Sequence, residues 1–85
     1  MVWVYNLDFY LPTGGSGGGA VYDTYEQAVE SRNFFVSVMD LSYDDIKKLV
    51  DSGSYPAIVD QYVGTLLWSK EPGSRGVGIG PIAEQ

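Results

Sequence analysis

A chain of 85 residues is expected to form one domain with a small core, and its composition excludes several kinds of site. It contains neither cysteine nor histidine, which rules out disulfides, zinc sites built on those residues, and the commonest general base and thiol nucleophile. Eleven acidic residues against five basic ones give a net charge of −6, which argues against direct binding to nucleic acid, because phosphates are bound by Lys and Arg.

The first ten residues after Met1 predict a β-strand. Along residues 2–11, large aromatic and aliphatic residues at the odd positions alternate with a more polar set at the even positions, Val2, Val4, Asn6, Asp8 and Tyr10. This period of two is typical of a strand with one buried face. The expected buried set is Trp3, Tyr5, Leu7, Phe9 and Leu11. Pro12 ends this strand, because proline cannot donate a hydrogen bond to a neighbouring strand.

A glycine-rich run follows, with five glycines between Gly14 and Gly19. Glycine costs the most conformational entropy to order, so residues 12–19 are expected to form the flexible tip of a hairpin that returns through Ala20-Val21-Tyr22. An inserted Gly-Ser linker would have the same composition. The run also satisfies a dinucleotide-binding pattern, but that chemistry needs a helix at the glycines, and the nearest helix start is Thr24.

A first helix is predicted to begin at Thr24, which forms a capping box with Gln27. Its apolar side continues to Met39, but Arg32 lies in the middle of that side. Either Arg32 extends its charged head to water, or the helix stops and residues 34–40 form a strand. The continuous helix is the preferred interpretation.

A second helix is expected between Ser42 and a C-terminal cap at Gly53. Beyond it, the segment 57–62 is ambiguous between a helical turn and a strand, and residues 65–68 are predicted to be a strand. The end of the chain alternates glycine with aliphatic residues at 76–82. It is expected to be an edge strand or, over 76–85, a mobile tail.

Together these elements predict the α+β class, with a small, mainly antiparallel sheet and two helices packed on one face. The sheet would contain the N-terminal hairpin and one or more C-terminal strands. No apolar run reaches the length of a membrane span, and the N-terminus lacks the pattern of a secretory signal. A soluble protein in the cytoplasm of a cell or host is therefore expected.

The sequence favours a non-enzymatic interaction module without cofactor or metal. The hypothesis is a small acidic inhibitor or adaptor, of the kind that some viruses and mobile elements encode, which binds a basic patch on a partner such as a nucleic-acid-binding protein. Tyrosine is favoured in protein interfaces, so exposed Tyr and acidic residues are the candidate contacts. They are Asp23, Glu26, Glu30, Asp40, Tyr43, Asp44, Asp45, Tyr55 and Tyr62.

Two alternatives stay open. A homo-oligomer could bury the 76–82 segment or a sheet edge between copies. A small-ligand or anion binder could use the backbone amides of the glycine-rich run. A metal site at Asp40, Asp44 and Asp45 is disfavoured, because acidic residues are expected in the first turn of a helix.

Overall fold

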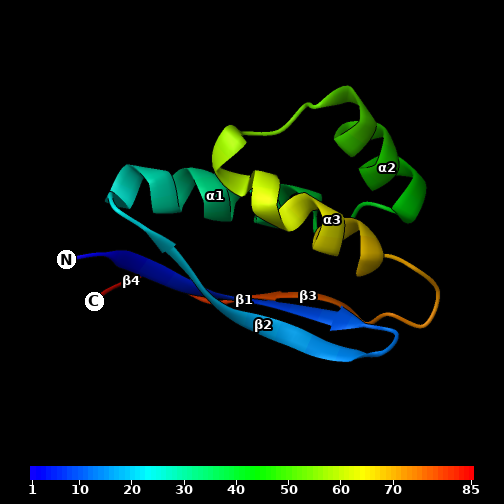
Figure 1. The fold of residues 1–85 in the computed structure, drawn as a ribbon, viewed down its shortest axis with the longest axis horizontal. Coiled ribbons are helices and arrows are strands. Elements are labelled where there is room, and N and C mark those ends of the chain that lie inside the picture. The colour runs from blue at the N-terminus through cyan, green and yellow to red at the C-terminus, as the bar shows by residue number, and fades with distance from the viewer.

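The computed structural model describes residues 1–85 and has a four-stranded antiparallel sheet with three helices over one face (Figure 1). This confirms the α+β prediction, with one more helix than expected. None of the helices combines the length and apolar character that a membrane crossing requires. The elements in chain order are β1 (Trp3–Leu11), β2 (Gly14–Tyr22), α1 (Tyr25–Val38), α2 (Tyr43–Ser52), the 3-10 helix η1 (Ala57–Val59), α3 (Asp60–Trp68), β3 (Gly76–Ile79) and β4 (Ala83–Glu84).

Strand β1 lies in the centre of the sheet, between β2 on one side and β3 and β4 on the other. Its alternation has the predicted consequence, because Tyr5, Leu7 and Phe9 are buried beneath the helices while Asn6 and Tyr10 are exposed on the opposite face.

The glycine-rich run is a strand, which corrects the expected position of the hairpin tip. Strand β2 begins at Gly14, and the register runs without interruption from the Leu11–Gly14 pair to the Trp3–Tyr22 pair. Only Pro12 and Thr13 separate the two strands. Glycine is weak in strands because it offers no side chain to pack, but here the outward side chains of β1 lean over the glycines.

The C-terminal segment also belongs to the sheet. Strand β3 pairs with residues 7–10 of β1, and β4 pairs with Trp3 and Val4. Of the two alternatives for the C-terminal segment, the edge strand is therefore the correct one. The segment 76–85 is not a free tail, because residues 76–79 and 83–84 pair with β1.

Helix α1 continues to Val38, as preferred, and starts with the predicted capping box between Thr24 and Gln27. Arg32 fits within it because its Nε donates a hydrogen bond to the backbone oxygen of Gly80, at 2.8 Å. Helix α2 has the predicted caps as well, Ser42 at its start and Gly53 at its end in a left-handed conformation with φ of 68°.

Residues 65–68 are helical, so the predicted strand there is wrong. The whole segment from Ala57 to Trp68 forms η1 and α3. Val59, Val63 and Leu66 are buried at helical spacing against the sheet and α1, and this burial decides the conformation. The residue types of Leu66-Leu67-Trp68 favour a strand locally, but the helical spacing of the buried residues before them favours a helix.

Candidate functional site: a groove between β2 and α3

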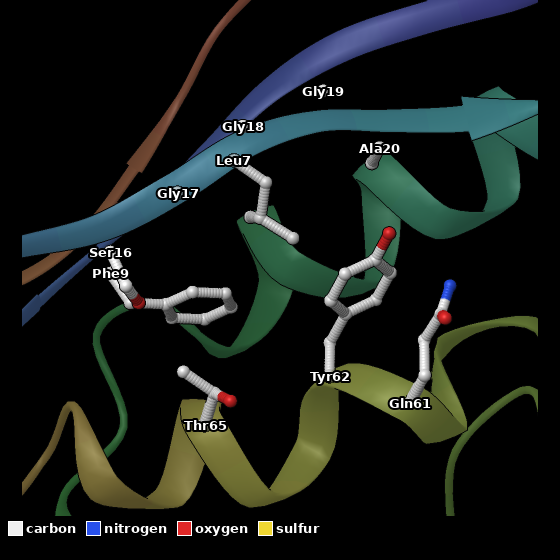
Figure 2. A pocket seen from close by; sticks show the side chains of 10 residues that line it. All are labelled: Leu7, Phe9, Ser16, Gly17, Gly18, Gly19, Ala20, Gln61, Tyr62 and Thr65. Atoms are coloured by element: carbon white, nitrogen blue, oxygen red, sulfur yellow. The ribbon is translucent and has the colours of Figure 1, made fainter.

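A cavity of about 410 Å³ lies between β2 and α3 (Figure 2). Its volume falls in the range of roughly 300–1,000 Å³ that is usual for binding pockets. Strand β1 contributes apolar side chains, β2 contributes mostly backbone, and α3 contributes the polar side chains. The lining residues are Leu7, Phe9, Ser16, Gly17, Gly18, Gly19, Ala20, Gln61, Tyr62 and Thr65.

The cavity follows directly from the sequence of β2. Directly opposed residues of paired strands share a face of the sheet, so Ser16, Gly18 and Ala20 lie on the same face as their partners Phe9, Leu7 and Tyr5, beneath the helices. All three are small. A Cβ atom added at Gly18 would have no neighbour within 4 Å. The helix therefore faces a strand that does not fill the space between them.

The α3 wall carries the polar groups of the cavity. In Figure 2 the Tyr62 hydroxyl points toward β2 near Ala20, with the Gln61 amide beside it. The Tyr62 ring packs edge-on against Phe35, with 5.9 Å between ring centroids. The Tyr62 hydroxyl can donate a hydrogen bond, and burial raises the pKa of this phenol above its ordinary value.

A buried hydrogen-bonded cluster links α1 to the two strands that contribute to the cavity. The Ser31 hydroxyl lies 2.5 Å from the Tyr5 hydroxyl and 2.6 Å from the Tyr22 hydroxyl. Burial raises the pKa of Tyr5 well above its ordinary value, so this phenol remains neutral. The cluster therefore joins α1 to β1 and β2.

Strand β2 is the free edge of the sheet on this side. On the other side of β1, the backbone oxygens of Asn6 and Tyr10 accept hydrogen bonds from the backbone amides of Gly80 and Arg75, both at 2.8 Å. The amide and carbonyl of one residue point to the same side of an antiparallel strand, and the next residue points to the other side. The even residues of β1 thus face β3, and the odd residues face β2.

The unpaired backbone groups of β2 can therefore be assigned. The Leu7–Gly18 pair exchanges hydrogen bonds, so the amides and carbonyls of Gly15, Gly17 and Gly19 point away from the sheet. Natural edge strands are usually protected by charged side chains, proline or bulges. These three glycines have no side chain to shield the edge, which is open to another strand.

Asp8 lies on the opposite face of the sheet, on β1, one strand in from the free edge. Its carboxylate leans over its partner Gly17, where an added Cβ atom would collide with Oδ1 and would lie 2.9 Å from the Asp8 Cα. No cation pairs with Asp8, since the single ion pair of the molecule joins Lys47 and Asp51 at 3.0 Å. A half-buried carboxylate is thus presented toward the free edge.

The structure does not bring the predicted contact residues together. Asp23, Glu26 and Glu30 lie just before and within the first two turns of α1, whereas Asp40 and the start of α2 lie beyond its other end. The 14 residues of α1 separate its two ends by roughly 20 Å, so the two groups do not form one cluster.

The second acidic group is Asp40, Tyr43, Asp44 and Asp45, with Asp44 and Asp45 in the first turn of α2. The Lys70 ammonium near Asp40 donates to the backbone oxygen of Met39. The Tyr55 hydroxyl donates to Asp60 at 2.9 Å. No three acidic side chains come together in a way that could hold a metal ion.

Of the nine candidate residues, only Tyr62 lines the cavity. Asp8 and Thr65 were not predicted as site residues, and Ser16 and Gly18 were included only through the glycine-rich run of the small-ligand alternative. Ser16 and Gly18 could have been found by assuming a two-residue turn after β1 and continuing the strand pairing beyond it. That pairing places these small residues opposite Phe9 and Leu7. No family model matches the chain, and the searches of curated proteins and of solved structures found no match either.

Proposed function

We propose that this protein is a non-enzymatic interaction module that binds an extended segment of a partner protein as an additional strand beside β2. The observation that carries the proposal is the open, glycine-lined edge of β2 directly beside the cavity. In strand addition, backbone hydrogen bonds supply affinity and pockets for alternate side chains supply specificity. Both are available here on one side of the sheet.

The charge of the module supports a basic partner. The eleven acidic residues outnumber the five basic ones and are distributed over the helices, the loops and the sheet, so the module as a whole is negatively charged. A net negative charge speeds the approach of a positively charged partner, such as a nucleic-acid-binding protein. An inhibitor or adaptor would use the same surface.

The two alternatives fit this geometry less well. Amides that bind an anion converge on one point, whereas those of Gly15, Gly17 and Gly19 project in a row from an extended strand, next to the Asp8 carboxylate. Two copies of the protein that paired through β2 would bring two charges of −6 together. A partner of opposite charge avoids that repulsion.

A matched pair of substitutions at Gly15 tests strand addition. Gly15 has an outward amide, and an added Cβ would have no neighbour within 4 Å. Peptides of twelve residues are selected from a random phage-displayed library on the wild-type protein, and their affinities are measured by calorimetry. Gly15→Pro removes the outward amide and is expected to weaken binding about tenfold. Gly15→Ala keeps the amide and is expected to change binding by about twofold at most.

Thermal unfolding of both variants controls for damage to the fold. Selected peptides that bind the Gly15→Pro variant as tightly as the wild type would contradict the proposal, as would a library that yields no binders. Dimerisation of the wild type that the proline abolishes would instead assign the edge to a second copy.

A further inference from the structure

We infer that the bound segment carries Lys or Arg opposite Gly17, with an apolar residue on each side of it. This inference rests on the proposed function and specifies its ligand. It follows from the placement of Asp8 and of the cavity on opposite faces of the same edge.

The basic residue is assigned from the outer face of the sheet. A segment residue opposite Gly17 would direct its side chain to the face on which Asp8 lies, because opposed residues share a face. The added strand would lie about 10 Å from β1, two strand spacings away. Asp8 already covers part of that distance by leaning over Gly17, and a long basic side chain covers the rest.

Gly17 is required for this arrangement. Any side chain at position 17 would occupy the space of the Asp8 carboxylate. The carboxylate is half-buried and has no cation within the molecule, so a partner that supplies one gains a charge-assisted contact.

The apolar neighbours are assigned from the inner face. The residues before and after the basic one point to the other face of the sheet, opposite Ser16 and Gly18. Neither of these fills the space, so the incoming side chains would meet Leu7 and Phe9 across the strand. An aliphatic or aromatic side chain suits that surface.

These requirements exclude β2 of a second copy as the favoured occupant. Residues 14–22 contain no Lys or Arg, and six of the nine are glycine or alanine. The occupant is therefore a segment of a different protein in which a basic residue stands between two apolar ones.

The test repeats the peptide selection on the wild type, on Asp8→Asn and on Glu26→Gln, an exposed acid at the start of α1. Wild-type and Glu26→Gln selections are expected to share a Lys or Arg between two apolar residues, and the Asp8→Asn selection is expected to lose that preference. Replacing the basic residue of a selected peptide by Gln should weaken binding to the wild type about tenfold. The same peptide replacement should have little effect on binding to Asp8→Asn, because that variant has already lost the contact between the basic residue and the Asp8 carboxylate.

The outcomes separate this inference from the proposed function. Peptides that need the Gly15 amide but show no basic preference would overturn the inference alone. An equal loss of preference in Glu26→Gln would also overturn it, because the preference for a basic residue would then come from the overall negative charge of the protein and not from contact with Asp8. Absence of any peptide that depends on the β2 edge would overturn both.

Discussion

Replacing Phe35 by alanine is expected to remove about 3–5 kcal/mol of the free energy of unfolding. Phe35 has no exposed surface, and its ring packs against Phe9, Phe34 and Tyr62, with ring centroids 5.2–6.3 Å apart. It joins α1 to β1 and α3 and supports two of the side chains that line the cavity. A domain of this length has a total stability of roughly 4–13 kcal/mol, so the loss would be a large part of it.

Urea unfolding followed by circular dichroism measures this loss. The matched control is Val36→Ala in the next position of the same helix, because Val36 is 43% exposed. The control is expected to change stability by about 0.5 kcal/mol at most. Similar losses for the two variants would mean that Phe35 does not occupy the core position described here.

Replacing Gly18 by valine is expected to stabilise the fold and to weaken binding. An added Cβ at Gly18 meets no atom within 4 Å, so the valine side chain would extend into open space in the cavity. Valine favours strands over glycine by about 1 kcal/mol, which corresponds to a rise of roughly 4–8 °C in the melting temperature. The same side chain would occupy the space that receives the apolar residues of the bound segment, so affinity is expected to fall by about tenfold or more.

Calorimetric titration with the selected peptides and thermal unfolding measure the two effects separately. Gly15→Val is the control, since it adds the same side chain at an equally open position on the other face of the sheet. It should keep binding. A Gly18→Val protein that is more stable and binds as before would show that the cavity is not part of the binding site.

The elements that could be predicted are those whose signals are local. The alternation of β1, the capping box at Thr24 and the caps of α2 each depend on residues within a few positions of one another, and all three are present. The end of β2 at Ala20-Val21-Tyr22 was predicted as a strand, but its glycine-rich part, residues 14–19, could not be, because the order of those residues depends on pairing with β1. A helical turn over 57–62 was one of two alternatives, but the rest of α3 was missed for a similar reason, since the burial of Val63 and Leu66 depends on the sheet and α1.

The candidate site was largely beyond the sequence because its parts are distant in the chain. The cavity requires α3 to lie over β2, about 40 residues earlier, and only the fold shows that Ser16 and Gly18 face it. Asp8 becomes relevant only when the register pairs it with Gly17. Tyr62 was identified as a candidate because of its residue type, and its place in the cavity wall was not foreseen.

Amide hydrogen exchange of the free protein, followed by NMR, tests the central claim that residues 14–19 form an ordered strand with an open edge. The amides of Ser16 and Gly18 bond to β1 and are expected to exchange slowly, whereas those of Gly15, Gly17 and Gly19 face solvent and are expected to exchange fast. Alternating protection along the segment is the predicted result. Uniformly fast exchange from Gly14 to Gly19 would contradict it and would restore the flexible hairpin tip.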